Sequence, residues 1–308
     1  MRIAFLGTPE FALPVLQMLI DRPGVTLAVF TQPDRPVGRK AILTPPPVKQ
    51  LAERHGIPVF QFEKIRSEEG VAALEAFAPD LMVTAAFGQL LGAKNLAVPK
   101  FGTINVHGSL LPSYRGASPI QTAILNGDRV TGVTTMFTDI GMDTGDMLLR
   151  QEVEIAADDT YETLSEKLSV VGASLLSETL DRLEAGTLTR IPQNNAEATV
   201  CHLITKQDGK IDFAESVKKC HDRIRAMNPW PVAYAMLDGQ PLKLYEAAPS
   251  DLPLDDASCG TLKVVGKKLY VRCLDGYLNI RSLQCPGKKR MSAESYLCGC
   301  NLDGKQLV

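Results

Sequence analysis

The chain opens with Met1-Arg2-Ile3-Ala4-Phe5-Leu6-Gly7, an apolar run closed by a glycine and followed by Thr8-Pro9-Glu10. A short apolar run of this kind predicts a buried strand. From Pro9 to Ile20 the apolar residues then recur at helical spacing. A strand that leads directly into a helix is the repeating step of parallel α/β sheets, so this stretch predicts the start of such a sheet.

The same alternation continues through the first half of the chain. Further strands are expected at Val25–Thr31, Pro58–Phe60, Asp80–Ala85, Gly102–Val106 and Gly132–Thr138. Helices are expected at Val48–His55, Glu68–Phe77, Pro119–Asn126 and, behind an N-cap at Thr160, Tyr161–Leu183. This pattern predicts an α/β fold with a doubly wound, mostly parallel, Rossmann-like sheet and helices on both faces.

The pattern changes after Gly186. Residues 187–204 are polar and irregular, which predicts a linker between a catalytic domain at 1–186 and a second domain at 205–308. The second domain begins with an expected helix at Ala214–Met227. Short strands separated by turns follow, at Ala233–Leu237, Pro241–Ala248, Thr261–Val265, Lys268–Cys273 and Tyr277–Ser282. They predict a smaller antiparallel β-barrel of OB-like type.

Composition narrows the class of protein. A chain of 308 residues with 45% hydrophobic and 22% charged residues is typical of a soluble protein of about two domains. No apolar run reaches the ~20 residues that span a bilayer, and the first residues form an expected strand rather than a signal or transit peptide. Seven cysteines, an odd number, indicate free thiols in a reducing, bacterial-type cytoplasm. Cys298-Gly299-Cys300 lacks a second nearby Cys or His pair, so no metal is expected.

Three polar residues stand where expected strands end. Asn105 and His107 close one strand, and Asp143 lies in the Gly-rich loop Gly141–Asp146 after another. Residues two apart on a strand face the same side, so Asn105 and His107 can address one atom. An amide donor, an imidazole that titrates near neutral pH and a carboxylate that orients it can stabilise an oxyanion and move a proton. The alternative is that His107 only ends a strand and Asp143 only makes a turn.

The connection from Gln32 to Lys49 is unusually long. Connections between a strand and the next helix normally span about 2–6 residues, whereas this one is basic at its tip and rich in proline. Long loops on a rigid sheet often carry function, although a surface ornament is the alternative. From Thr205 onward basic residues also outnumber acidic ones, which fits a polyanionic partner or a chance scatter of surface charge. The first turn lacks the G-x-G-x-x-G pattern, so dinucleotide binding is not favoured.

Two motifs resemble those of the 10-formyltetrahydrofolate-dependent formyltransferases. The run Asn105–Pro112, with Tyr114-Arg115-Gly116, resembles the family signature, and Asp139–Asp146 resembles its second motif, with Asp143 at the position of the catalytic aspartate. Formyltransferases that act on glycinamide ribonucleotide or sugar nucleotides share these motifs, as do formyltetrahydrofolate hydrolases.

Three further stretches resemble the branch of the family that acts on aminoacylated initiator tRNA. They are Phe5–Ala12, Thr31–Pro36 with Gly38-Arg39, and Arg223–Pro231. The resemblance therefore extends over essentially the whole chain. It implies an enzyme of translation initiation that takes 10-formyltetrahydrofolate as co-substrate and formylates the α-amino group of initiator Met-tRNA. A monomer with no membrane association is expected.

The resemblance also implies roles for individual residues. Asn105 and protonated His107 would stabilise the oxyanion, and Asp143 would tune His107. The folate would be bound by two groups of residues. They are Ser109, Leu110, Leu111 and Pro112, and, around the pterin, Phe87, Gly88, Leu90, Ile140 and Gly141.

The inserted loop would contact the acceptor stem through Arg39, supported by Lys40 and Arg35, since the guanidinium fork suits phosphates and base edges. Ala41 and Ile42 follow Lys40 where family members carry further basic residues, so this loop has fewer positive charges than the family pattern. A sugar-nucleotide formyltransferase, a formyltetrahydrofolate hydrolase and a non-catalytic folate- or RNA-binding module are the alternatives. The inserted loop argues against the first, and the intact trio argues against the last.

Overall fold

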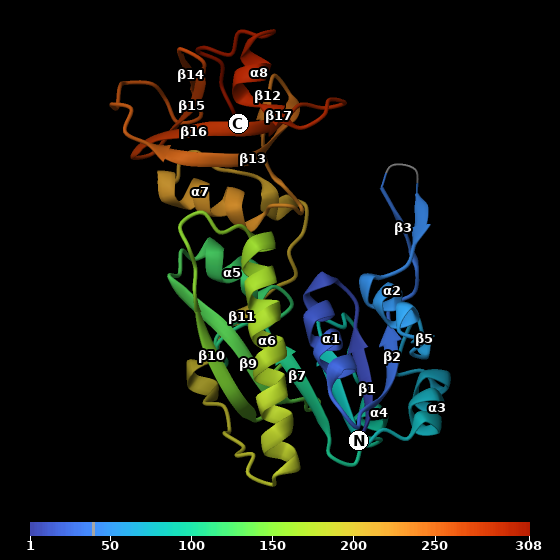
Figure 1. The fold of residues 1–308 in the computed structure, drawn as a ribbon. Helices are drawn as coiled ribbons and strands as arrows, with labels where there is room; N and C mark the ends of the chain where they lie inside the picture. The colour runs from blue at the N-terminus through green and yellow to red at the C-terminus, as the bar shows by residue number, and fades with distance from the viewer. Residues whose placement is uncertain (39–40) are drawn as a thin grey trace. The chain divides into compact units, whose positions relative to one another are not determined.

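The computed structural model describes residues 1–38 and 41–308, which divide into two compact units (Figure 1). The N-terminal unit comprises Met1–Gly116, Val130–Glu154 and Ser165–Val200. The C-terminal unit comprises Ala117–Arg129, Ile155–Leu164 and Cys201–Val308. Both units are therefore built from separated segments, whereas the domains expected from the sequence are continuous. The functional roles expected for those domains stay predictions.

A seven-stranded sheet forms the centre of the N-terminal unit, with strand order β10-β9-β7-β6-β1-β2-β5. Its strands are β1 (Arg2–Gly7), β2 (Thr26–Thr31), β5 (Val59–Gln61), β6 (Leu81–Ala85), β7 (Thr103–His107), β9 (Val130–Phe137) and β10 (Met147–Glu154). Five adjacent strands pair in parallel, and β9 is antiparallel to both β7 and β10, so β9 alone runs in the opposite direction within this sheet. The mostly parallel α/β sheet is confirmed. The strand β10 was not expected, and strand–helix alternation alone gave no sign that β9 runs the other way.

Helices cover both faces of this sheet (Figure 1). They are α1 (Leu13–Asp21), α2 (Pro47–Arg54), α3 (Glu68–Phe77), α4 (Ala93–Leu96) and α6 (Tyr161–Glu184), with short 3-10 turns at η1 (Glu10–Ala12) and η2 (Asn195–Glu197). On one face, Leu74 of α3 packs in a cluster with Leu6 and Met82. On the other face, α6 approaches so closely that a Cβ at Gly172 would lie 2.8 Å from the Val106 side chain. Thr160 caps α6, as expected, because its hydroxyl accepts the amide N–H of Thr163 at 3.3 Å.

The long connection after β2 is a hairpin of two short exposed strands, β3 (Arg35–Val37) and β4 (Ile42–Thr44). Its base is tied to the sheet, because the Lys49 ammonium lies 2.9 Å from the Asp34 carboxylate and the Gln61 amide donates to that carboxylate at 2.7 Å. These hydrogen bonds, first from Gln61 and then from Lys49, hold the pKa of Asp34 below its usual value. The hairpin thus projects from a firmly bonded base.

The C-terminal unit is built on an antiparallel sheet of strand order β12-β13-β16-β15-β14, with β17 paired to β16. Its strands are β12 (Ala233–Leu237), β13 (Gln240–Ser250), β14 (Leu262–Val265), β15 (Lys268–Cys273), β16 (Gly276–Gln284) and β17 (Met291–Ser292). The helices of this unit are α5 (Pro119–Leu125), α7 (Val217–Ala226) and α8 (Ala293–Leu297), with a 3-10 turn at η3 (Gln207–Gly209). Elsewhere in the chain, the short strands β8 (Arg115–Gly116) and β11 (Val200–Cys201) pair with each other.

The antiparallel C-terminal sheet is confirmed, whereas the expected OB-like barrel is not. Single bridges join Leu307 to Leu237 and Gln306 to Thr261, but no ladder between strands of the described residues closes the sheet. The barrel therefore stays a prediction. No helix in residues 1–38 and 41–308 is long and apolar enough to cross a membrane.

A buried ion pair lies within α7, and its arginine also bonds to a neighbouring loop of the C-terminal unit. The guanidinium of Arg225 donates to the Asp222 carboxylate at 2.6 Å and to the carbonyl oxygen of Asp159 at 2.6 Å. Both side chains are nearly excluded from solvent, at 10% and 4% exposure. A buried charge needs such partners, because its lost hydration is not replaced otherwise.

We predict that Asp222→Ala lowers the free energy of unfolding by about 3–5 kcal/mol, because the Arg225 guanidinium would stay buried without its carboxylate. Urea denaturation measures the change. Glu215→Ala is the matched control, since it breaks an exposed pair with Lys219 close by and should cost less than about 1 kcal/mol. Equal losses in the two variants would contradict the prediction.

Candidate active site

Two of the candidate catalytic side chains lie at the carboxyl end of the central strand β7, and the third, Asp143, lies in the loop between β9 and β10. Asn105 and His107 stand on β7 and point to the sheet face that α3 covers, because Asn105 is paired in register with Thr84 of β6. This end of the sheet adjoins the point between β1 and β6 where the strand order reverses, which is where doubly wound sheets bind ligands.

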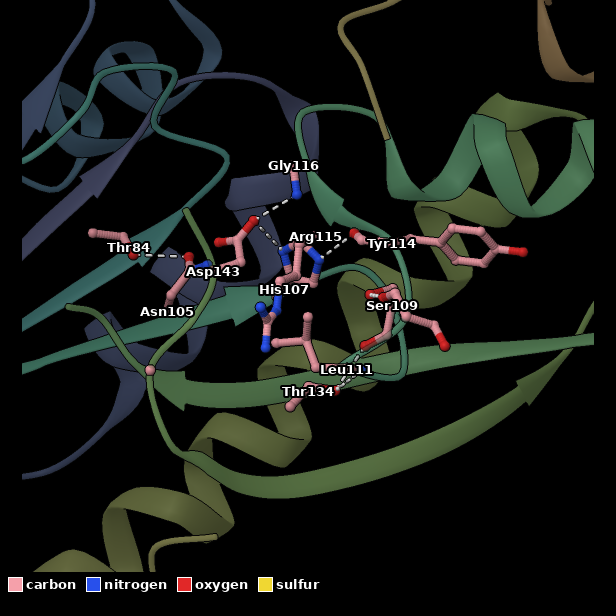
Figure 2. A network of polar contacts seen from close by, with 12 residues as sticks. Thr84, Asn105, His107, Ser109, Leu111, Tyr114, Arg115, Gly116, Thr134 and Asp143 are labelled. Atoms are coloured by element: carbon pink, nitrogen blue, oxygen red, sulfur yellow. Dashed lines mark hydrogen bonds and ion pairs between the residues drawn. The ribbon is translucent and has the colours of Figure 1, made fainter. Parts of the chain in front are cut away.

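Asn105 is oriented by its neighbour on β6. The Thr84 hydroxyl donates to the Asn105 side-chain oxygen at 2.8 Å (Figure 2). Because that oxygen accepts, the Nδ2 group of the same amide faces the other way and can donate to a bound molecule. The amide is therefore preorganised as a hydrogen-bond donor.

His107 lies between two oxygen atoms. Its Nε2 is 3.0 Å from the Tyr114 carbonyl oxygen, and its Nδ1 is 3.6 Å from Oδ2 of Asp143 (Figure 2). Both ring nitrogens thus face oxygen atoms. The side chain is buried, at 6% exposure, so few waters compete for these contacts. The separation from Asp143 is longer than a hydrogen bond, which leaves the Nδ1–H able to donate to a substrate oxygen.

Asp143 is held in an uncommon backbone conformation, with φ of +53°. Its carboxylate accepts the backbone N–H of Gly116 at 2.8 Å. The loop around it is tightly drawn, because a Cβ on Gly145 would lie 1.9 Å from the Phe137 carbonyl oxygen. Asp139 closes the loop by accepting the Thr144 hydroxyl at 2.7 Å. The structure therefore brings Asn105, His107 and Asp143 together, as the sequence predicted (Figure 2).

The segment 109–112 is bonded to β9. The Thr134 hydroxyl donates to the Ser109 carbonyl at 2.7 Å and accepts the Leu111 N–H at 3.1 Å (Figure 2). Ser109 and Leu111 are both fully buried, so their side chains support the loop, and only Leu110 and Pro112 present partly exposed side chains. A cavity of about 340 Å³ borders Leu110 over β10, and none of the three candidate catalytic residues lines it.

The residues expected around a pterin lie in two loops. Phe87 is buried, and its carbonyl accepts the Thr8 hydroxyl at 2.9 Å, so its loop is fastened to the turn after β1. Gly88 has φ of +78°, a conformation that suits glycine. Leu90 and Ile140 are 66% and 74% exposed although both are apolar. Gly141 donates its N–H to Asp139. The role of these residues stays a prediction.

Of the candidate tRNA-binding residues, Arg35 lies on β3 of the hairpin. Arg35 is exposed and 2.5 Å from the Glu63 carboxylate, a surface pair that opens at little cost. Arg39 and Lys40 lie outside the described residues.

Sequence reasoning missed several residues that hold the trio. Thr84 and the Tyr114 carbonyl gave no signal, because their roles depend on which strands are neighbours and how the chain bends. Gln193 and Asn195 lie in the expected linker, yet they bond to Arg115 at 2.9 Å each. Within residues 1–38 and 41–308 no group of three His, Cys, Asp or Glu side chains is placed to hold a metal ion.

Comparison with known proteins gives the family. A family model described as formyl transferase matches residues 1–180, and one described as formyl transferase, C-terminal domain, matches residues 203–301. The chain is 46% identical to the methionyl-tRNA formyltransferase of Geobacter metallireducens over 98% of this chain and 96% of that protein. It is 44% identical to the same enzyme of Ruminiclostridium cellulolyticum, over 98% of each chain. The chain belongs to the methionyl-tRNA formyltransferase family.

Solved structures show that the fold of this family member is shared more widely. An N-formyltransferase from Helicobacter canadensis, in complex with folinic acid and dTDP-3-aminofucose, matches with a TM-score of 0.66 at 19% identity, over 90% of this chain and 97% of that chain. HypX from Aquifex aeolicus, in complex with tetrahydrofolic acid, matches with a TM-score of 0.65 at 18% identity, over 96% of this chain and 47% of that chain. At these identities the likeness concerns the fold alone.

We predict that Thr84→Val lowers formyl-transfer turnover about 10-fold, because the Asn105 amide loses the bond that orients it. Steady-state kinetics measure the effect. Thr103→Val is the matched control on the neighbouring strand, since the hydroxyl of Thr103 is buried without a hydrogen-bond partner in the described part of the chain. Unchanged turnover in Thr84→Val, or an equal loss in the control, would refute the orienting role.

Proposed function

We propose that this protein transfers the formyl group of 10-formyltetrahydrofolate to the α-amino group of methionine esterified to initiator tRNA. One observation carries the proposal. The Asn105 amide, His107 imidazole and Asp143 carboxylate converge at the ends of central strands, in a chain that matches methionyl-tRNA formyltransferases over nearly its full length. The trio supplies the chemistry, and the relatives' names indicate the acceptor.

Formyl transfer begins when the free amine attacks the formyl carbon and the carbonyl oxygen becomes an oxyanion. Asn105 donates from its Nδ2 group to this oxygen, since Thr84 occupies the other end of the amide. His107 donates from Nδ1, because Tyr114 holds Nε2. Donors that are already oriented stabilise the oxyanion without reorganisation during the reaction.

The intermediate then collapses. The bond between the formyl carbon and N10 breaks, the electron pair stays on N10, and N10 takes a proton while the attacking nitrogen loses one. Asp143 provides a carboxylate 3.6 Å from Nδ1 of His107 that accepts a proton directly or through water. No covalent enzyme intermediate is required.

The folate is proposed to bind beside the trio. Phe87, Gly88 and Leu90 follow β6, and Ile140 and Gly141 follow β9, so backbone groups and exposed apolar side chains of both loops are available to a pterin ring. Leu110 and Pro112 supply side-chain contacts to the folate, whereas the buried residues Ser109 and Leu111 fix the position of their loop. A folate co-substrate is also supported by the tetrahydrofolic acid and folinic acid in the complexes of HypX and the Helicobacter canadensis enzyme.

We propose that the tRNA acceptor stem contacts Arg35, Arg39 and Lys40, and that the C-terminal domain, which we propose to be OB-like, contacts the phosphate backbone. The bonded base of the hairpin supports this, since Lys49 and Gln61 anchor Asp34. The odd number of cysteines, seven, supports the proposal of a cytoplasmic location. The monomeric state stays a prediction.

The proposal predicts which acceptor gains the formyl group. Purified protein with formyl-labelled 10-formyltetrahydrofolate is offered charged initiator tRNA, a panel of sugar nucleotides that carry an amino group, or no acceptor. We expect label on methionine. Transfer to an amino sugar would identify a sugar N-formyltransferase, and formate released without acceptor would identify a hydrolase. His107→Ala is the control and should lower transfer by about 10²–10⁴-fold.

We predict that Arg39→Ala raises the KM for charged tRNA about 10-fold and leaves folate binding unchanged, because it removes a phosphate or base-edge contact. Arg54→Ala, an exposed arginine at the end of α2, is the control for general charge loss. Wild-type affinity should fall as salt is raised, through counterion release. A parallel loss of folate binding, or an affinity independent of salt, would contradict this role.

A further inference from the structure

A segment outside the two family motifs, around Gln193, hydrogen-bonds to the loop of the candidate catalytic aspartate. The side-chain Nε2 of Gln193 donates to the Asp143 carbonyl oxygen at 2.8 Å and to the Gly145 carbonyl oxygen at 2.7 Å. Gln193 follows α6 by nine residues in the sequence and lies in the stretch expected to be a passive linker. One amide thus joins this stretch to the backbone of the aspartate itself.

The orientation of the Gln193 amide is determined by its partners. Arg115 donates from Nε to the Gln193 Oε1 at 2.9 Å, and a guanidinium can only donate. The two loop carbonyls can only accept, so they require the NH₂ end. Arg115 is itself buried and is held by Asn195, whose side-chain oxygen accepts from Nη2 at 2.9 Å. The donor and acceptor ends of Gln193 are therefore both assigned by chemistry.

Asp143 needs such support. Its φ of +53° lies in the left-handed region, which residues other than glycine adopt only when their surroundings impose it. Gly116 holds the carboxylate, and Gln193 holds the carbonyl of the same residue. If the carbonyl were released, the backbone could relax and turn the carboxylate away from His107.

We propose that Gln193, oriented by Arg115, is a positioning residue that locks the Asp143 loop so that the carboxylate faces His107. This inference rests on the proposed catalytic role of Asp143. It makes Gln193 a residue of formyl transfer that touches neither substrate and acts only through Asp143. Loss of its two hydrogen bonds should therefore lower kcat and leave the KM values for folate and tRNA nearly unchanged.

The test is a double-mutant cycle between Gln193→Ala and Asp143→Asn, measured as kcat and KM for formyl transfer to charged initiator tRNA. We expect Gln193→Ala alone to lower kcat on the order of 30-fold, since small misplacements of a catalytic group have effects of this size. In the Asp143→Asn background the same change should lower kcat by less than about 2-fold, because the group it positions is already lost.

Three further variants make the result decisive. Gln193→Met keeps the side-chain volume without its donors, so it repeats the test if Gln193→Ala fails to fold in a thermal melt. Gln193→Glu keeps the bond to Arg115 but sets an oxygen against two carbonyls, and it should lose at least as much activity as Gln193→Ala. Asn194→Ala removes the neighbouring amide, whose bonds to Ala196 and Glu197 stay within the segment, and should leave kcat within about 2-fold.

The outcomes separate the two proposals. Full loss in Asp143→Asn with normal kcat in Gln193→Ala and Gln193→Met would overturn the positioning role and leave the catalytic role of Asp143 standing. Equal fold-losses from Gln193→Ala in both backgrounds would also overturn it, because Gln193 would then act independently of Asp143. Normal kcat in Asp143→Asn would instead refute the catalytic role on which the inference rests.

Discussion

The site depends on one buried imidazole held between two oxygen atoms. The Tyr114 carbonyl faces one ring nitrogen of His107 at 3.0 Å, and the Asp143 carboxylate faces the other at 3.6 Å. The two oxygens come from different loops, so the ring can be placed only if both loops are placed first. This requirement explains why the hydrogen bonds made by Thr134, Gly116 and Gln193 fix the backbone of the loops around the site. A reacting group can be no better oriented than the chain segments that hold it.

Much of the fold could be predicted from the sequence because the evidence for it is local, whereas the catalytic roles of Asn105, His107 and Asp143 stay predictions. Apolar runs closed by turns marked the strands of the parallel core, and the spacing of Asn105 and His107 followed from strand geometry. The direction of β9 could not be predicted, because the alternation of strands and helices does not show whether a returning strand pairs parallel or antiparallel with its neighbour. β10 was missed for a related reason: its burial falls along the strand from Met147 toward Glu154, so it lacks the apolar run of a buried strand.

The limit of prediction from the sequence is clearest in the expected linker. Residues 187–204 are polar and irregular, which is the composition of a flexible connection, and nothing local distinguishes a polar side chain that faces water from one that hydrogen-bonds to a distant part of the folded chain. Gln193 and Asn195 belong to the second kind, since both bond to the buried Arg115. Their partners lie 78 and 80 residues away in the sequence, so only the folded chain reveals them.

Specificity for the acceptor must arise outside the trio. Proteins at 18–19% identity, one of them in complex with an amino-sugar nucleotide, share the fold over most of this chain. An amide, an imidazole and a carboxylate interact with a developing oxyanion and a proton. The oxyanion and the proton are the same whichever molecule carries the amine. Selection of a tRNA requires contacts that reach far beyond the reacting atoms. The hairpin after β2 is our proposed source of such contacts: Lys49 and Gln61 bind its base to the sheet through Asp34, while the apolar side chains of Val37, Ile42 and Leu43 stand exposed along its strands. A projection with a rigid base can add binding energy for one acceptor without moving the catalytic groups, so the chemistry and the choice of substrate are able to vary independently in this fold.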